Sequence, residues 1–241
     1  MLVASAALLT GSLALAHESQ AGTGQEHAAS PEGHHAFVHP FVAHMGMPDE
    51  PGEISLRLMS LQERNIGSVS GTYGFHVEAG IADRWGLHLR NDKVSSKKMT
   101  EMMLQYAVLR SDSGENGLAL IGEVEFPTGP TTDNQNKHLF GVSFAYLWAP
   151  IVSVNSVVHY DPQEKMVEWE IAFVSRLTEK IFPILEFRGE ASKDMSLANA
   201  LFAWKFKAQE NSAFGLGYQV PISKDREYDS QLILAAEFNF N

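Results

Sequence analysis

The sequence predicts an all-β fold, an antiparallel transmembrane β-barrel of about twelve strands with up-and-down topology. Two observations predict it. Apolar residues recur with a period of two from Gly52 to the end of the chain, and the connections between these segments alternate between tight and longer. Successive side chains of a strand point to opposite faces, so this period indicates strands with one apolar and one polar face.

The last predicted strand shows the pattern clearly. Its alternate residues from Leu232 to Phe240 are apolar, whereas Glu237 and Asn239 fall on the other face. An aromatic residue at the end of the chain, with a second one two positions earlier, resembles the closing strand of bacterial outer-membrane barrels. We therefore expect the outer-membrane assembly machinery to recognise Phe238 and Phe240.

The connections provide an independent criterion. The tight ones follow every second strand and include Ala82 to Arg84 and Ala149-Pro150, whereas the longer ones include Gln62 to Ser70, Pro127 to His138 and Ser223 to Asp229. Outer-membrane barrels have an even number of strands, short periplasmic turns and longer outer loops. The alternation therefore predicts that both termini are periplasmic and that the protein lies in the cell outer membrane of a Gram-negative bacterium.

Aromatic residues of the apolar faces gather near the predicted strand ends. Two groups are expected, one at each membrane interface, as in the aromatic girdles of such barrels. The alternative is a soluble β-protein with an aromatic core, but it would have to point its Glu and Arg faces outward. The periplasmic group contains Trp85, Trp148, Phe206, Phe238 and Phe240, and the outer group contains Tyr73, Tyr160 and Trp169.

Composition excludes several classes of protein. The chain has 241 residues, of which 44% are hydrophobic, and its net charge is −11. An acidic chain is a poor ligand for nucleic acid, because phosphate binding needs clustered Lys and Arg. The absence of cysteine excludes disulfides and thiolate metal sites. After Ala16 no run of 18 apolar residues occurs, so no membrane-spanning helix is predicted.

The N-terminal part of the chain divides into two predicted segments before the barrel. Residues 1–16 are uncharged and end in Ala14-Leu15-Ala16, which indicates a signal peptide, although no basic residue precedes the apolar run. Residues 17–51 are rich in small residues and histidine without periodicity, which predicts a flexible periplasmic leader. Residues 52–241 form the predicted outer-membrane barrel.

The leader carries candidate metal ligands. Clustered imidazoles on a flexible chain can bind Cu or Zn, which is the one cofactor that the sequence suggests. The alternative is a solvated segment of biased composition, since no fixed ligand spacing is visible. The candidate ligands, which accompany His17, are His27, His34, His35, His39 and His44.

The polar faces of the predicted strands would line the lumen. Two interpretations remain open: a channel that weakly prefers cations, because carboxylates favour cations, or a lumen plugged by a network of ion pairs. The predicted lining also contains His76, His159, Lys205 and Lys207. Its principal members are Arg57, Glu78, His88, Arg90, Glu123, Glu125, Glu168, Glu170, Arg176, Glu186, Arg188, Glu190 and Glu237.

The sequence does not favour an enzyme. Some outer-membrane barrels are lipid hydrolases, which need a serine beside a histidine base. Ser156 and His159 share a predicted strand, but they are three positions apart, so their side chains fall on opposite faces. We find no Gly-x-Ser-x-Gly, P-loop or dinucleotide fingerprint.

Three motifs carry a resemblance to a family. Gly80 to Leu87, Phe126 to Gly129 and Phe214 to Pro221 resemble the corresponding segments of outer-membrane channels named for the meta-pathway of phenol degradation. The resemblance covers residues 37–241. It implies passive passage of small solutes, including aromatic or hydrophobic compounds, and no catalytic residues. The histidine-rich leader departs from the family pattern. The alternatives are a plugged structural or interaction barrel, or a metal-binding outer-membrane protein that uses its leader.

Overall fold

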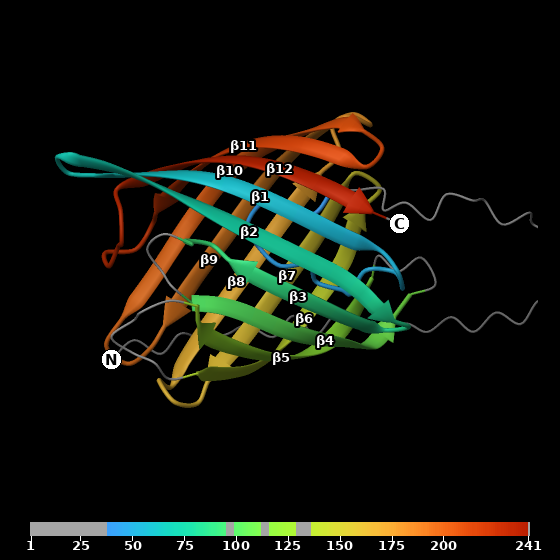
Figure 1. Cartoon of the computed structure of the whole chain (residues 1–241), viewed down its shortest axis with the longest axis horizontal. Helices are drawn as coiled ribbons and strands as arrows, with labels where there is room; N and C mark the ends of the chain where they lie inside the picture. Colours follow the sequence, from blue (N-terminus) through green and yellow to red (C-terminus); the bar gives the residue numbers. More distant parts are fainter. Residues whose placement is uncertain (1–37, 95–98, 112–115, 129–135, 241) are drawn as a thin grey trace, which may run out of the picture. The chain divides into compact units, whose positions relative to one another are not determined.

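The computed structural model describes residues 38–94, 99–111, 116–128 and 136–240. In these residues the regular structure consists of strands, and no helix among them is long and apolar enough to cross a bilayer. The strands, labelled in Figure 1, are β1 (Ile54–Asn65), β2 (Ser68–Ala82), β3 (Trp85–Asn91), β4 (Met99–Arg110), β5 (Gly117–Pro127), β6 (Lys137–Ala149), β7 (Val152–Asp161), β8 (Met166–Ser175), β9 (Ile181–Ala191), β10 (Ser196–Gln209), β11 (Ser212–Pro221) and β12 (Ser230–Phe240).

The strands form a closed barrel in which every strand pairs antiparallel with its neighbours in sequence. The first and last strands close it, with a register that runs from Ile54 opposite Phe240 to Arg64 opposite Ser230. Closure satisfies the backbone hydrogen-bonding groups of both edge strands, which would otherwise be left unpaired. The predicted all-β, twelve-stranded, up-and-down barrel is confirmed.

The period of two separates an apolar outer surface from a polar interior. In β12, Leu234 is 54% exposed, whereas its neighbour Ile233 is completely buried. Both predicted aromatic groups contain exposed members near strand ends, for example Trp148 in one group and Tyr160 in the other. The outer surface of the barrel is therefore made largely of apolar side chains, among them Leu58, Tyr73, Leu120, Phe140, Phe202, Trp204, Phe214, Leu216, Leu234 and Phe240.

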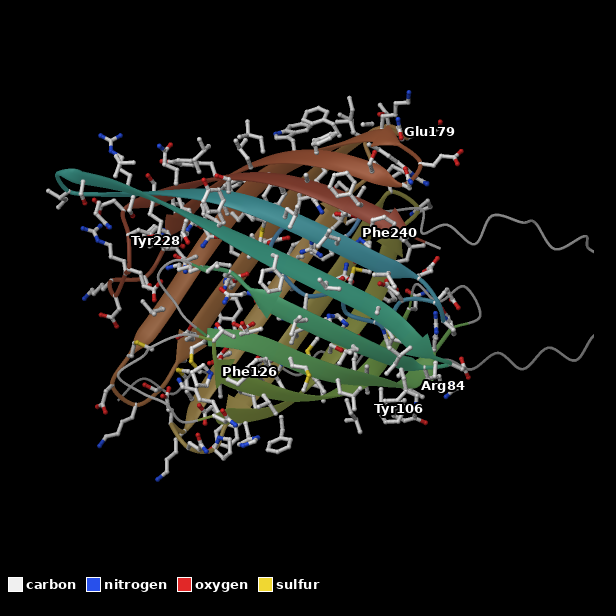
Figure 2. All side chains as sticks on the ribbon, viewed as in Figure 1. Arg84, Tyr106, Phe126, Glu179, Tyr228 and Phe240 are labelled. Atoms are coloured by element: carbon white, nitrogen blue, oxygen red, sulfur yellow. The ribbon has the colours of Figure 1, made fainter. Side chains whose placement is uncertain are left out.

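The two ends of the barrel differ in their connections. We call the end that holds Phe240 the terminal rim; Arg84 and Glu179 lie at this end in Figure 2, in the connections after β2 and β8. Tyr228, in the connection between β11 and β12, lies at the opposite rim. Tight turns such as Pro150-Ile151, between β6 and β7, lie at the terminal rim.

One predicted outer loop is wrong. Residues Gln62 to Ser70 form most of a β-hairpin, because β1 continues to Asn65 and β2 begins at Ser68. Polar side chains indicated a loop, but backbone pairing continues past them and ends only at Asn65 opposite Ser68. Gly67 makes the sharp reversal possible, since its φ of 78° lies in the left-handed region that glycine adopts without steric cost.

Residues 38–49 lie inside the barrel and Glu50 next to them is exposed; we call residues 38–50 the lumen segment. Phe41 is completely buried, and Val42, Ala43 and Met47 are 2–3% exposed. The prediction of a flexible leader is therefore corrected for this part of residues 17–51. Residues 1–37, including the predicted signal peptide, lie outside the described residues.

The apolar part of the interior surrounds the lumen segment. Phe41 and Val42 pack in a cluster with inward-facing residues of five strands. Burial of this apolar surface is the main favourable contribution to holding the segment in place. The residues contributed by the barrel are Met59, Leu61, Val174, Phe182, Ile184, Leu201, Ala203, Ile233 and Ala235.

Candidate functional site

A carboxylate on the barrel wall binds the backbone of the lumen segment. Glu186 of β9 accepts hydrogen bonds from three successive backbone N–H groups, those of Phe41, Val42 and Ala43. The bonds to Val42 and Ala43 are 2.9 and 3.1 Å long. These N–H groups have no strand or helix to pair with, and a buried N–H without a partner is costly. Glu186 therefore fixes an irregular segment where water is excluded.

A lysine on β10 binds the carbonyl groups of the same segment. Lys205 Nζ donates to the carbonyl oxygens of His39 and Pro40, at 2.9 and 3.0 Å, and forms an ion pair with Glu237 of β12. Its side chain is 1% exposed. A buried ammonium needs hydrogen-bond acceptors and an opposite charge, and the lumen segment supplies two of these acceptors.

Arg57 on β1 provides a third anchor. Its Nη1 donates to the carbonyl oxygens of Phe41 and Ala43, at 3.3 and 3.4 Å. Its Nη2 donates to Glu78 Oε1 of β2 at 3.2 Å. The guanidinium therefore connects the lumen segment to two adjacent strands of the wall.

The wall has space for the segment where it carries glycine. A Cβ atom at Gly215 of β11 would lie 2.4 Å from the Phe41 ring, and one at Gly80 of β2 would lie 2.0 Å from the Glu50 carbonyl oxygen. Neither contact is sterically possible without movement. The barrel interior is thus shaped to fit this one segment.

The middle of the segment is bound by charged and amide groups. Glu170 of β8 accepts from the backbone N–H of His44 and lies 2.9 Å from its Nδ1, while Arg90 of β3 donates to Glu170 Oε1 at 3.1 Å. Asn155 of β7 accepts from the N–H of Gly46 at 3.0 Å. These contacts extend the anchoring to strands on the other side of the barrel.

A cavity of about 90 Å³ remains beside the lumen segment, and we call it the vestibule. Val42 and His44 of the segment contribute to its lining. Among the described residues, carboxylates outnumber Lys and Arg in this lining. The charged lining residues are Asp92, Glu101, Glu123, Glu168, Glu170, Glu190 and Glu227 on the acidic side, and Arg90, Lys93 and Arg188 on the basic side.

Asp92, just after β3, pairs with the positively charged side chains of the vestibule. Both of its oxygens bind Arg90, at 3.0 and 2.6 Å, and it also binds Arg188 at 3.1 Å and His76 Nε2 at 2.7 Å. Burial alone would raise the pKa of Asp92, but the adjacent Arg90 guanidinium and the hydrogen bond from His76 hold that pKa well below its ordinary value. Asp92 is therefore ionised at neutral pH.

The predicted lumen-lining residues lie on the inner face of the barrel, with one exception. Arg176 lies beyond the end of β8, where its guanidinium donates to the Pro150 carbonyl oxygen in the neighbouring turn. The inner-face residues are Arg57, Glu78, His88, Arg90, Glu123, Glu125, Glu168, Glu170, Glu186, Arg188, Glu190 and Glu237, and several of them bind the lumen segment rather than face open solvent.

The predicted metal ligands fall into two groups. His27, His34 and His35 lie outside the described residues. His39 and His44 are buried in the lumen, where His39 Nδ1 lies 2.8 Å from Glu237 and His44 binds Glu170. These two histidines are thus held by the barrel wall and do not belong to a solvated leader.

Ser156 and His159 do not form a catalytic pair. The Ser156 hydroxyl donates to the Glu170 carbonyl oxygen at 2.9 Å, and the His159 ring faces Glu123 at 3.3 Å. The two side chains point to opposite faces of β7, as the spacing predicted.

Sequence reasoning missed Asp49, Asp92 and the role of Phe41. One signal was available. The inner face of β11 reads Ala213, Gly215, Gly217, which is too small to fill a barrel by itself. Such small inward residues indicate that something else occupies the adjacent space.

The fold, a closed antiparallel barrel of twelve strands with a charged interior, is shared by solved structures of outer-membrane porins and channels. The KdgM porin superposes with a TM-score of 0.61 at 8% identity, over 78% of this chain and 99% of its own. The NanC porin gives a TM-score of 0.56 at 8% identity, with the same two coverages. An outer-membrane channel from Pseudomonas putida F1 gives 0.57 at 8% identity, over 80% of this chain and 97% of its own.

Likeness at this level of identity shows the fold and does not extend to substrate. No protein-family model and no curated protein matches the chain. The resemblance to the phenol meta-pathway channels is therefore not confirmed, and the function has to be argued from the site.

Proposed function

We propose that this protein is an outer-membrane channel for passive passage of small solutes, held closed by its own lumen segment. The observation that carries the proposal is the contrast between an apolar outer surface and a charged interior in a closed barrel. A protein that only needed a stable core would bury its apolar faces. The solved neighbours described as porins and as an outer-membrane channel support the same class of function.

The outer surface supports a location in the lipid bilayer of the outer membrane. Exposed Leu and Phe side chains such as Leu216 and Phe202 would form a large apolar patch in water, which soluble proteins avoid. The tight turns at the terminal rim support a periplasmic position for both termini. Phe238 and Phe240 lie at the same rim at the end of β12, which suits recognition by the assembly machinery.

The vestibule supports a preference for cationic or neutral solutes. Its excess of carboxylates would attract cations and repel anions before they reach the lumen segment. For the same reason we do not expect nucleic acid to be a partner. The resemblance to phenol meta-pathway channels adds small aromatic compounds as candidate solutes, and we include them in the proposal on that basis alone.

A second candidate is a permanently closed barrel with a structural or interaction role. The observation that favours it is the number of anchors on the lumen segment, from Glu186, Lys205 and Arg57. If these contacts never open, no solute passes. The two candidates differ in one measurable property, the conductance of the intact barrel and of variants with a weakened anchor.

Planar-bilayer recording of the full chain separates them. Glu186→Gln replaces one acceptor oxygen by an NH₂ group that faces the backbone N–H groups of the lumen segment, so it should release the segment. The open probability should then rise at least about tenfold, which corresponds to a loss of about 1.4 kcal/mol of binding free energy between the segment and the wall. Glu190→Gln is the matched control, since it makes the same change on the same face of β9. A Glu186→Gln barrel as silent as the parent would support the structural candidate.

The charge preference has its own test. Glu101 lines the vestibule, so Glu101→Gln in the Glu186→Gln background should shift the reversal potential in a salt gradient toward lower cation selectivity. An unchanged reversal potential would remove the selectivity claim and leave the channel proposal in place.

A further inference from the structure

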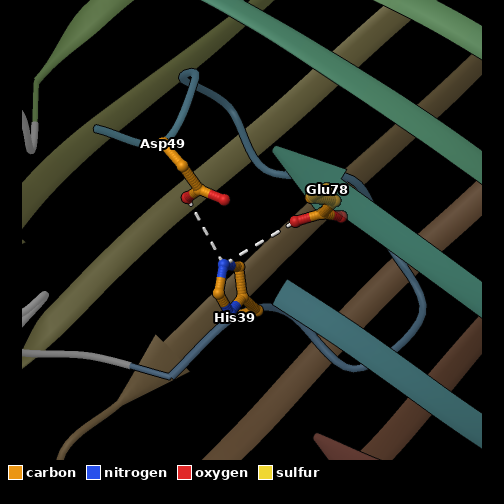
Figure 3. Close-up of side chains that lie close together, drawn as sticks. All are labelled: His39, Asp49 and Glu78. Atoms are coloured by element: carbon orange, nitrogen blue, oxygen red, sulfur yellow. Dashed lines mark hydrogen bonds and ion pairs between the residues drawn. The ribbon is translucent and has the colours of Figure 1, made fainter. Parts of the chain in front are cut away.

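Three side chains meet where the lumen segment touches β2. His39 and Asp49 come from the lumen segment and Glu78 comes from the wall, and all three are buried (Figure 3). His39 Nε2 lies 3.4 Å from Asp49 Oδ1 and 3.7 Å from Glu78 Oε2. One ligand atom from each residue lies within 4.8 Å of the other two.

These separations fit a shared ion better than direct contact. A charge-assisted hydrogen bond between a ring N–H and a carboxylate measures about 2.7–2.9 Å. In a tetrahedral site with metal–ligand bonds of about 2.0–2.2 Å, neighbouring ligand atoms are about 3.3–3.6 Å apart. The His39 distances to Asp49 and Glu78 are close to the second range.

The His39 ring is oriented as a metal ligand would be. Its Nδ1 faces Glu237 Oε1 at 2.8 Å, and Glu237 is itself paired with Lys205. A proton on Nδ1 donated to Glu237 leaves the lone pair of Nε2 directed toward Asp49 and Glu78. Metal-binding histidines generally donate their second ring N–H to a carboxylate in this way, which fixes the tautomer and raises the basicity of the ligand atom.

Unsatisfied polar atoms provide a second, independent observation. Glu78 is 1% exposed, and its Oε2 accepts no hydrogen bond from any described residue, although its Oε1 binds Arg57. His88 of β3 is 3% exposed; its Nδ1 has no hydrogen-bond partner within the same residues and lies 3.8 Å from Glu78 Oε1. Buried polar atoms without partners are costly, and a cation between His39, Asp49 and Glu78 would satisfy Glu78 Oε2.

We propose that His39, Asp49 and Glu78 bind a divalent transition-metal ion of the Zn(II) class. Imidazole and carboxylate ligands without thiolate suit Zn(II), and the chain contains no cysteine. The ion would join two points of the lumen segment to the wall of the barrel. This site therefore pins the segment in the lumen, and the proposal is independent of whether the barrel conducts.

Calorimetry on the folded full chain in detergent tests the site, with Zn(II) as the titrant. The N-terminal histidines outside the described residues would also bind the ion, so His17, His27, His34 and His35 are first replaced by Gln. This variant should bind one equivalent of Zn(II) with a dissociation constant below millimolar. Zinc K-edge absorption should show nitrogen and oxygen neighbours at about 2.0–2.2 Å and no sulfur.

Two near-isosteric substitutions in that background decide the assignment. Loss of a residue that only orients a metal ligand weakens metal binding by roughly 10- to 100-fold. Asp49→Asn and Glu78→Gln each remove a ligand, so each should weaken Zn(II) binding by more than this. Glu190→Gln is the matched control and should leave binding unchanged. Heat-dependent gel mobility establishes that each variant is folded.

The proposal is overturned if the quadruple His→Gln variant binds Zn(II) no better than millimolar. It is also overturned if binding survives both Asp49→Asn and Glu78→Gln. Either result would identify the cluster as a network in which a protonated His39 pairs with carboxylates. Neither would affect the channel proposal, which rests on the apolar outer surface and the charged interior of the barrel and is tested separately by the bilayer recordings.

Discussion

The outer and inner faces of the barrel follow different rules, although they alternate along the same strands. On the outer face of β12, Leu232, Leu234 and Phe240 meet a uniform environment, so most large apolar side chains would serve. On the inner face, Ile233 packs against the lumen segment and Glu237 binds one particular histidine. The residues of a face exposed to solvent or lipid need only share one property, which here is an apolar side chain. Each residue of a face that binds a single segment has to fit the particular group that it contacts.

Ile233→Ala should have the largest effect, because Ile233 is completely buried in the cluster around Phe41. We expect the free energy of unfolding to fall by about 2–5 kcal/mol, as for other buried isoleucines replaced by alanine. Denaturant titration in lipid vesicles measures the change. A loss below about 1 kcal/mol would mean that the interior is not packed as the structure shows it.

Leu234→Arg tests the outer face at the adjacent position, near the middle of β12. An arginine on the lipid face at the bilayer midplane should lower the free energy of unfolding by about 2–4 kcal/mol. Ile222→Arg, in the connection after β11, is the control and should have little effect, because Ile222 is exposed outside the strands. Equal effects of the two substitutions would contradict a bilayer around the barrel.

Two glycines, one on each face of the barrel, also distinguish the inner face from the outer face. Gly215→Ala on the inner face brings a Cβ atom to 2.4 Å from the Phe41 ring, and overpacking of this kind costs about 1–3 kcal/mol. Gly122→Ala on the outer face meets no atom within 4 Å and should be neutral or slightly stabilising. Equal changes in the free energy of unfolding for the two substitutions, measured by denaturant titration, would mean that Phe41 does not pack against β11.

Acidification should have the smallest effect, and only at low pH. The pKa of Asp92 is held well below its ordinary value by Arg90 and His76 against the effect of burial. Its contribution to stability is therefore complete above about pH 3.9, the unfolded value, and is lost as the pH falls below it. The difference in free energy of unfolding between the parent and Asp92→Asn should stay constant from about pH 8 to 5 and shrink below about pH 4. A difference that disappears near pH 6 would contradict this prediction.

The difference between the outer and inner faces also explains which parts of the structure the sequence could predict. The outer face repeats one property at every second position, so the strands and the barrel followed from the period of two. The lumen segment has no such period: Phe41, Val42 and Ala43 are placed by Glu186, a residue more than a hundred positions away. Local patterns carry no information about such a contact, so the segment looked like a flexible leader.

Polarity misled the sequence analysis in two places for related reasons. Glu63 and Arg64 indicated a loop but continue the β1–β2 hairpin, because backbone pairing does not require apolar side chains. Arg176 had the right polarity for the lumen but lies past the end of β8. Of the two predicted metal ligands that the structure describes, His39 lies in the candidate cluster and His44 does not, and the partners Asp49 and Glu78 became visible only in three dimensions.

Thiol labelling can establish whether residues 38–50 fill the lumen. The chain contains no cysteine, so Ala43→Cys introduces a single thiol at a position that is 2% exposed. In the folded barrel it should react with a water-soluble maleimide at least about a hundredfold more slowly than Lys224→Cys, a ratio that corresponds to about 2.7 kcal/mol of protection. After heat denaturation both should react alike. Equal labelling rates in the folded barrel would mean that residues 38–50 do not fill the lumen.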